Sequence, residues 1–260
     1  MSILWAIASA AALLMALGWW WQERHRDAGI VDVLWALGMA GAAAAVAAAG
    51  EGDARLRLLV GAAGGVWGLR LGLHLLRDRV IGKPEDGRYQ AMRAWMGRRA
   101  SLGFFVFFQA QTAAVVLCVL PLAIVADLPW VGWGWCAAAM GLFALSLGGC
   151  TLADRQLARF RAAGSGGVCR DGLWRYSRHP NYFFEWLQWI GWGMLCALHP
   201  AWWGWLGTAM IAVMYLLLTR ITGIPHVERR CLAHRGEAYA RYQRTTNAFF
   251  PWFPRPEPRP

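Results

Sequence analysis

The sequence predicts an all-α fold: a polytopic integral membrane protein with seven transmembrane helices and a cytoplasmic C-terminal amphipathic helix. Hydrophobic residues make up 58% of the 260 residues, against roughly 45–50% in a soluble domain, and charged residues make up only 16%. The hydrophobic residues form long runs, and about 20 such residues suffice to cross a bilayer. The charged residues lie mostly between these runs, as they do in multi-pass proteins.

Seven apolar runs are predicted to span the membrane. The first has no basic segment before it and is long enough to span, so we expect a retained helix rather than a signal peptide. The last two runs adjoin one another and are separated mainly by His199 and Pro200. In chain order, the predicted spans are 2–21, 29–50, 57–76, 102–125, 128–150, 182–198 and 200–220.

Basic residues alternate between the two ends of these spans. Segments 22–28, 77–101, 151–182 and 220–260 hold 23 of the 26 Lys and Arg residues, whereas the alternate connections hold only Arg55 and Arg57. Because basic connections stay in the cytoplasm, we expect an outside N-terminus and a cytoplasmic C-terminus. This topology accounts for most of the net charge of +11, and no basic segment is patterned for nucleic acid.

The cysteines and the runs of small residues do not indicate a metal site, a disulfide framework or a ligand site. The six cysteines are scattered and none forms a CxxC pair, so they indicate packing or free thiols rather than a metal site or a disulfide framework. The run AGAAAAVAAAG at 40–50 is typical of closely packed membrane helices.

Three polar zones are predicted on the cytoplasmic side: 77–101, 151–186 and 220–250. The first contains the turn sequence KPEDGRY, although a solvated basic loop would look the same. In the second, the cations are all arginine, which favours bidentate contact with phosphate or carboxylate, and its glycines match no nucleotide-binding motif. The third is predicted to be an amphipathic helix, for which the alternative is a purely interfacial role on an anionic leaflet.

Four ionisable residues fall within or at the start of predicted spans: Asp32, Arg70, His74 and Glu185. An ionised side chain at the centre of a span costs about 2.5–3.5 kcal/mol, so such residues generally have a partner or a function. A structural ion pair between Asp32 and Arg70 is the simplest alternative to a functional role.

The C-terminal half resembles a known family. The stretch DGLWRYSRHPNYFFEW contains R-H-x-N-Y-x-x-E, an upstream helix carries Asp154 and Arg161, and a later segment contains E-x-x-C followed by a glycine and two tyrosines. These features resemble the steroid 5α-reductase and sterol C14-reductase superfamily, in its bacterial DUF1295 branch. The matching residues of the two motifs are Arg178, His179, Asn181, Tyr182, Glu185, Glu228, Cys231, Gly236, Tyr239 and Tyr242.

The resemblance implies a seven-helix membrane reductase, in a bacterial inner membrane, that binds NADPH from the cytoplasmic side. We expect it to be a monomer. Asn181 and Glu185 would hold the nicotinamide carboxamide, which both donates and accepts hydrogen bonds. Residues 1–125 would form the substrate-side half and 126–254 the cofactor-binding half of one domain, followed by a flexible tail at 255–260. The other expected cofactor residues are Arg70, Asp86, Arg88, Asp154, Arg159, Arg161, Arg170, Arg175, Tyr176, Arg178, His179, Tyr182, Glu228 and Tyr239.

The implied reaction is reduction of a carbon–carbon double bond conjugated to a carbonyl, in a lipophilic enone or steroid-like substrate from the bilayer. The chain lacks the Gln-Glu pair with which steroid 5α-reductases grip the carbonyl, and has Trp67 where their tyrosine is expected. We therefore expect Asp32 to act as acid or orienting group and Tyr89 as a second donor. Trp67 and His74 are the expected substrate-binding residues.

Two other classes fit parts of the sequence. Isoprenylcysteine carboxyl methyltransferases, which use S-adenosylmethionine, share an R-H-P-x-Y stretch that Arg178, His179, Pro180 and Tyr182 match. The pairing of Asn181 with Glu185 and the supply of arginines favour the reductase. A transporter would instead have polar groups near the midplane and inverted repeats, which the sequence does not show.

Overall fold

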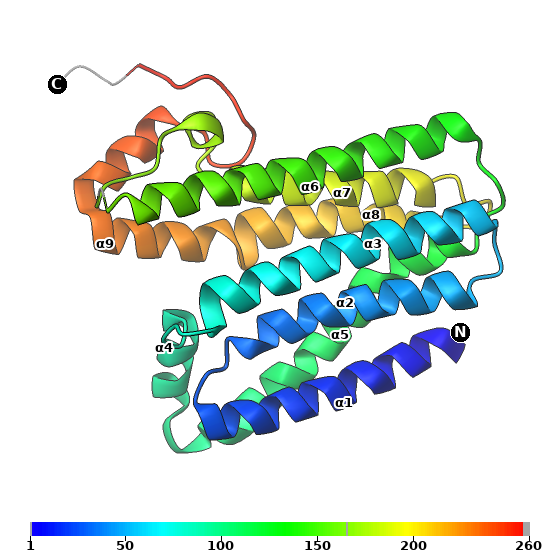
Figure 1. Cartoon of the computed structure of the whole chain (residues 1–260), viewed down its shortest axis with the longest axis horizontal. Coiled ribbons are helices and arrows are strands. Elements are labelled where there is room, and N and C mark those ends of the chain that lie inside the picture. The colour runs from blue at the N-terminus through cyan, green and yellow to red at the C-terminus, as the bar shows by residue number, and fades with distance from the viewer. Residues whose placement is uncertain (1, 165, 257–260) are drawn as a thin grey trace. The chain divides into compact units, whose positions relative to one another are not determined.

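The computed structural model describes residues 2–164 and 166–256, and in this part of the chain the regular structure is helical, without strands (Figure 1). Its helices group into two compact units that meet in sequence between Val131 and Gly132. Gly132 has φ 96°, a left-handed conformation that favours glycine.

The first unit is a bundle of four long helices and one short one. The helix α2 (Ile30–Ala49) packs against α1 (Ser2–His25), α3 (Ala54–Leu75) and α5 (Ala100–Ala126). The α3 helix continues into a π-helical turn, η1 (Leu76–Val80), and α4 (Gly87–Met96) and η2 (Gly97–Arg99) precede α5. Small residues let α2 and α3 approach closely: a Cβ on Gly68 would lie 2.7 Å from the carbonyl oxygen of Ala36.

At each end of this unit, hydrogen bonds join the segments that connect its helices. The N–H of Ala28, between α1 and α2, donates to Glu85 Oε1 at 2.9 Å, just before α4. At the other end, the N–H groups of Gly52 and Asp53 donate to the carbonyls of Ala126 and Leu128. The basic segment 77–99 therefore lies at one end of the unit, and the less basic α2–α3 connection lies at the other.

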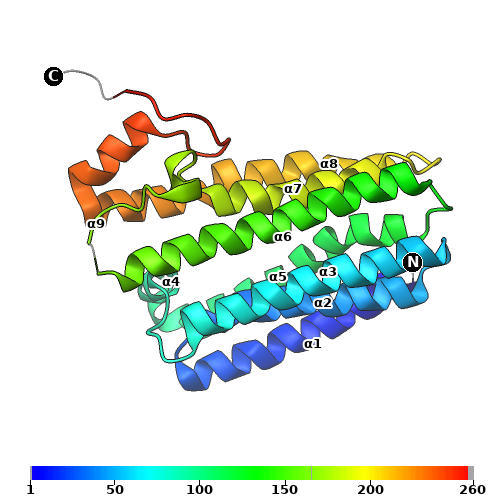
Figure 2. The same ribbon diagram turned by 45° about the horizontal axis from the view of Figure 1, so that its top comes forward.

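The second unit consists of α6 (Trp133–Ala162), α7 (Pro180–Cys196), α8 (Gly204–Leu216) and α9 (Ile224–Thr245), with α7 packed against both α6 and α8 (Figure 2). A short 3-10 turn, η3 (Gly172–Arg175), precedes α7, and a π-helical turn, η4 (Leu217–Ile221), joins α8 to α9. The α9 helix kinks at Gly236, where φ is 48°.

Within the described residues, six helical segments are long and apolar enough to cross a membrane, as a multi-pass membrane protein requires. The predicted span at 182–198 corresponds to α7, which has 17 residues and is not among the six. At 1.5 Å per residue its length is about 25 Å, slightly less than the ~30 Å hydrocarbon core. The number of seven spans and their orientation remain predictions.

The C-terminal segment after α9 is held against the rest of the unit as far as it is described. The N–H of Arg255 donates to the carbonyl of Thr245 at 2.8 Å, so the first residue of the predicted flexible tail has a fixed contact. Residues 257–260 of that tail lie outside the described part of the chain.

Candidate functional site

A carboxylate on α9 is the centre of the densest polar cluster in the second unit. Glu228 Oε1 accepts hydrogen bonds from Arg178 Nε at 2.6 Å and His179 Nε2 at 3.2 Å, and the Tyr239 hydroxyl lies 3.5 Å from the same atom. Glu228 Oε2 accepts from Gln243 Nε2 at 3.0 Å. Residues from the start of α7 and from both parts of the kinked α9 thus meet at one carboxylate.

The backbone before α7 places Arg178 and His179 in this cluster. Ser177 is fully buried; its hydroxyl accepts the N–H of His179 at 3.1 Å and donates to the carbonyl of Phe249 at 2.9 Å. The Tyr242 hydroxyl donates to the carbonyls of Trp174 and Ser177. Buried polar groups must be paired in this way, so the turn at 174–179 is fixed between α9 and the C-terminal segment.

His179 is nearly fully buried, and its ring stacks on Tyr182 at 5.5 Å between centroids. Burial lowers the pKa of His179 below its usual value, although the hydrogen bond to the Glu228 carboxylate opposes this effect. A neutral imidazole that donates from Nε2 to Glu228 fits both observations. Arg178 adds a permanent positive charge and also donates to the carbonyls of Gln243 and Thr246.

A second row of polar groups runs along α7 and faces α6. Asn181 Nδ2 donates to Asp154 Oδ1 at 3.4 Å, and the Cys150 thiol lies 3.3 Å from the Asn181 carbonyl and 3.8 Å from Glu185 Oε2. The buried Gln188 side chain donates to Glu185 Oε1 at 2.8 Å. Asn181 and Glu185 thus share the α7 face that their spacing predicted, and Asp154 joins them.

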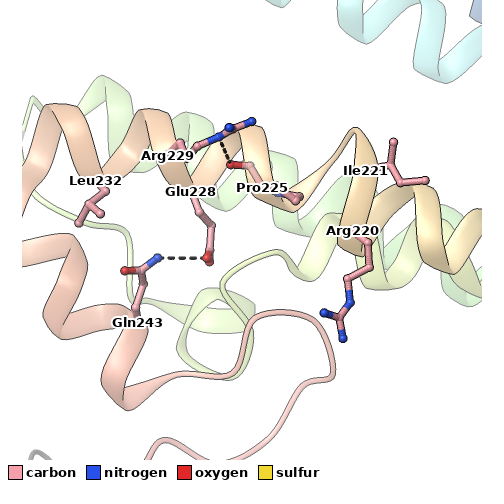
Figure 3. A pocket seen from close by; sticks show the side chains of 7 residues that line it. All are labelled: Arg220, Ile221, Pro225, Glu228, Arg229, Leu232 and Gln243. Carbon is pink, nitrogen blue, oxygen red and sulfur yellow. Dashed lines mark hydrogen bonds between the residues drawn. The ribbon is translucent and has the colours of Figure 1, made fainter.

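An open hollow of about 500 Å³ lies beside the Glu228 cluster, where η4 joins α9 (Figure 3). Glu228 and Gln243 lie on one side of it and Arg220 lies toward η4, while Ile221, Pro225 and Leu232 supply apolar walls. The Arg220 side chain makes no hydrogen bond or ion pair with another described residue. The hollow is open to the surface rather than enclosed.

Exposed arginines surround this end of the second unit. Arg159 and Arg161 lie in the last turn of α6, are exposed, and make no side-chain hydrogen bond or ion pair among the described residues. Arg170 lies over the Tyr242 ring at 5.4 Å and donates to the carbonyl of Ala238. Arg175 lies over the Tyr176 ring at 6.0 Å, so the predicted phosphate-binding arginines share one end of the unit.

The first unit holds the two predicted catalytic residues in direct contact. The Tyr89 hydroxyl donates to Asp32 Oδ1 at 2.8 Å, and Arg88 Nη2 donates to Asp32 Oδ2 at 3.0 Å. Arg79 approaches the same carboxylate at 3.6 Å. Burial raises the pKa of Asp86, but hydrogen bonds and charge from Arg88 outweigh this effect, and the net pKa lies below its usual value.

The remaining predicted residues of this unit lie on α3. Trp67 is buried and packs edge-on against Trp35 at 5.9 Å, as a core residue would. His74 Nε2 lies 4.0 Å from Asp78 Oδ2, and Arg70 is one helical turn before His74. The alternative of an Asp32–Arg70 pair is not needed to explain Asp32, because Arg79, Arg88 and Tyr89 supply its partners.

Sequence reasoning missed five residues that the structure adds to these clusters: Arg79, Cys150, Gln188, Arg220 and Gln243. Gln188 could have been found, since it is three residues after Glu185 on the same helix and is polar within an apolar run. Gln243 and Arg220 had no such signal, because their places depend on the kink at Gly236 and on the η4 turn.

Among the described residues, no group of three or more His, Cys, Asp or Glu side chains is placed to hold a metal ion.

Neither the curated proteins nor the solved structures include a match to the chain. The model of a family described as a protein of unknown function, DUF1295, matches residues 18–246. Because this match covers most of the sequence and includes both polar clusters, the chain belongs to the DUF1295 family.

Proposed function

We propose that this protein is an NADPH-dependent membrane reductase that acts on a carbon–carbon double bond conjugated to a carbonyl, in a lipophilic substrate. The observation that carries the proposal is the polar row of Asn181, Glu185 and Gln188 on the otherwise apolar helix α7. Polar and ionisable groups within such a helix are costly, and a bound polar ligand would explain their retention.

The chemistry of the second unit suits a dinucleotide phosphate. Asn181 offers amide groups, and Glu185 offers carboxylate oxygens, to the two sides of a carboxamide. Arg159 and Arg161, exposed at the end of α6, are suited to a 2′-phosphate, which is the reason to prefer NADPH over NADH. The hollow beside Glu228 and Gln243 has room for one part of such a ligand.

NADPH, when bound, would supply the hydride that reaches the β-carbon of the substrate. The protein must then stabilise the negative charge that develops on the carbonyl oxygen, until a proton from water reaches the α-carbon and completes the reduction. We assign this task to the Tyr89 hydroxyl, whose single proton is donated to Asp32 in the structure and would turn to the carbonyl oxygen while Arg88 holds Asp32 in place. Both Asp32 oxygens already accept hydrogen bonds, from Tyr89 and Arg88, which favours the orienting role over that of an acid.

We further propose that the protein is a monomer in a bacterial inner membrane, with an outside N-terminus and a cytoplasmic C-terminus. In the first unit the basic segment 77–99 lies at one end of the helices. In the second unit the arginine-rich segments 155–178 and 220–255 likewise lie together, opposite the α7–α8 turn, which contains no Lys or Arg. This asymmetry supports a cytoplasmic position for the basic ends.

The test is a thermal-shift titration of the detergent-purified protein with NADPH, NADH and S-adenosylmethionine. A ligand that binds only the native state raises its stability, by about 2.7 kcal/mol at 100 times its dissociation constant. We expect stabilisation by NADPH in the wild type and in Glu237→Ala, and its loss in Glu185→Ala. Stabilisation by S-adenosylmethionine alone would reject the reductase and favour the methyltransferase.

A further inference from the structure

The segment that follows α9 is an ordered strap rather than a loose tail. We call residues 246–255 the C-terminal strap. Its backbone is bonded to the turn before α7: Arg178 N–H donates to the Asn247 carbonyl at 2.8 Å, and Trp252 N–H donates to the Tyr176 carbonyl at 2.9 Å. The Ser177 hydroxyl donates to the Phe249 carbonyl at 2.9 Å. The strap therefore has a fixed position along residues 176–178.

One face of the strap packs on the apolar helices of the second unit. Phe249 is 5% exposed, and its ring lies 5.9 Å from Phe183, 5.8 Å from Trp186 and 5.4 Å from Tyr215. Phe250 stacks on Tyr215 at 6.1 Å but is half exposed. Because Trp186 belongs to α7 and Tyr215 to α8, the strap packs against apolar side chains of both helices.

The other face presents two large aromatic rings outward. Trp252 is 68% exposed and Phe253 is 73% exposed, and the two rings meet edge-on at 6.4 Å. Phe253 also lies edge-on to Tyr176 at 5.9 Å. Single exposed apolar residues need no explanation, but a fixed aromatic pair that adjoins an apolar helix surface is typical of an interaction site.

The charges beside this pair are positive. Arg255 follows Phe253 by two residues, and Arg175 lies over the Tyr176 ring that Phe253 contacts. Both arginine side chains are exposed, and neither makes an ion pair with another described residue. The Trp252 ring, whose N–H gives it a polar edge, favours the headgroup level of a bilayer, while the Phe253 ring is purely apolar. Basic side chains at that level are attracted to anionic lipids. The combination fits a leaflet surface better than the acidic or neutral surface of a partner protein.

We propose that Trp252 and Phe253 insert into the headgroup–acyl boundary of an anionic membrane leaflet and that Arg175 and Arg255 contact its lipid phosphates. The insertion fixes the strap and, through the bonds to Tyr176, Ser177 and Arg178, the turn that carries the Glu228 cluster. This membrane contact does not depend on the proposed reductase activity, because it rests on the strap alone.

The test is a spin label placed at Phe253→Cys in a Cys231→Ser background, where the other five cysteines are buried. The full chain is reconstituted in nanodiscs of phosphatidylcholine, with or without phosphatidylglycerol. Power saturation then compares the access of oxygen, which concentrates in lipid, with that of a soluble nickel chelate. A label at Glu237→Cys is the matched control, because that side chain is 69% exposed on α9.

We expect the label at position 253 to favour oxygen and the label at position 237 to favour the nickel chelate. We expect the depth at position 253 to increase when phosphatidylglycerol is present. Equal nickel access at both positions would overturn the proposal, and protection from both reagents would indicate a protein partner instead. If the first variant does not fold, a label at Trp252→Cys measures the depth of the same aromatic pair. If the depth of the label is the same with and without phosphatidylglycerol, the proposed attraction to anionic lipid is overturned.

Discussion

Removing the charge of Glu228 tests whether the cluster on α9 is the centre of the second unit. The variant Glu228→Gln keeps the size and shape of the side chain and still offers one oxygen acceptor. It leaves the Arg178 guanidinium, whose side chain is 10% exposed, without its carboxylate partner. Uncharged acceptors then remain for that guanidinium, namely the amide oxygen of the new glutamine and the backbone carbonyls of Gln243 and Thr246.

The expected cost follows from the burial of this pair. Breaking a buried ion pair by removing one partner costs about 3–5 kcal/mol, because the other charge is left uncompensated. Glu228 is 17% exposed and glutamine retains one acceptor, so we expect a smaller loss, about 2–3 kcal/mol. In a chain of this size that corresponds to a fall in Tm of roughly 5–10 °C.

The assay is thermal unfolding in detergent of the wild type, Glu228→Gln, Arg178→Gln and the double variant. The four melting curves form a double-mutant cycle, which isolates the coupling between the two side chains from the other effects of each substitution. We expect a coupling of about 1–3 kcal/mol in favour of the native pair.

A matched control lies on the same helix. Glu237 pairs with Arg244, but both side chains are far more exposed, at 69% and 46%, so Glu237→Gln is expected to leave the Tm nearly unchanged. If Glu228→Gln and Glu237→Gln lowered the Tm equally, or if the cycle showed no coupling, the Glu228 cluster would have no special role in stability.

Three further predictions concern other parts of the chain. Gly68→Ala should destabilise the first unit by about 1–3 kcal/mol in thermal unfolding, because its Cβ meets the backbone of α2, whereas Gly65→Ala, with open space around its Cβ, should not. Tyr89→Phe should cost about 1 kcal/mol by the same assay, through loss of the hydrogen bond to Asp32, and an unchanged Tm would contradict that bond. Burial lowers the folded-state pKa of His179, so below about pH 6.5 the unfolded chain binds a proton that the folded chain excludes. Stability should therefore be constant above that pH and fall as the pH is lowered toward 5, and this slope should weaken in His179→Gln.

The order of residues alone predicts a helical membrane protein and places several candidate site residues on one face of a helix. The apolar runs place six of the helices that could span a membrane, because burying about 20 apolar residues in lipid is a local property of the chain. The spacing of Asn181 and Glu185 places them on one face of α7, since residues four apart on a helix are neighbours. The proximity of Arg178, His179 and Glu228 was expected only from the family resemblance. In the structure, Arg178 and His179 both form hydrogen bonds with the Glu228 carboxylate.

Tertiary structure alone decided which charges meet. A structural pair with Arg70 was the alternative considered for Asp32, because both residues fall in predicted spans. In the structure the partners of Asp32 come from the η1 π-turn and from α4, which no sequence period reveals. Gln243 reaches Glu228 only because α9 kinks at Gly236. The proline-rich end was expected to be flexible, and up to Arg255 it is held by backbone hydrogen bonds to the α9 end and the turn before α7. Hydrogen bonds between segments that are distant in sequence form only where tertiary packing brings those segments together, and local sequence does not determine that packing.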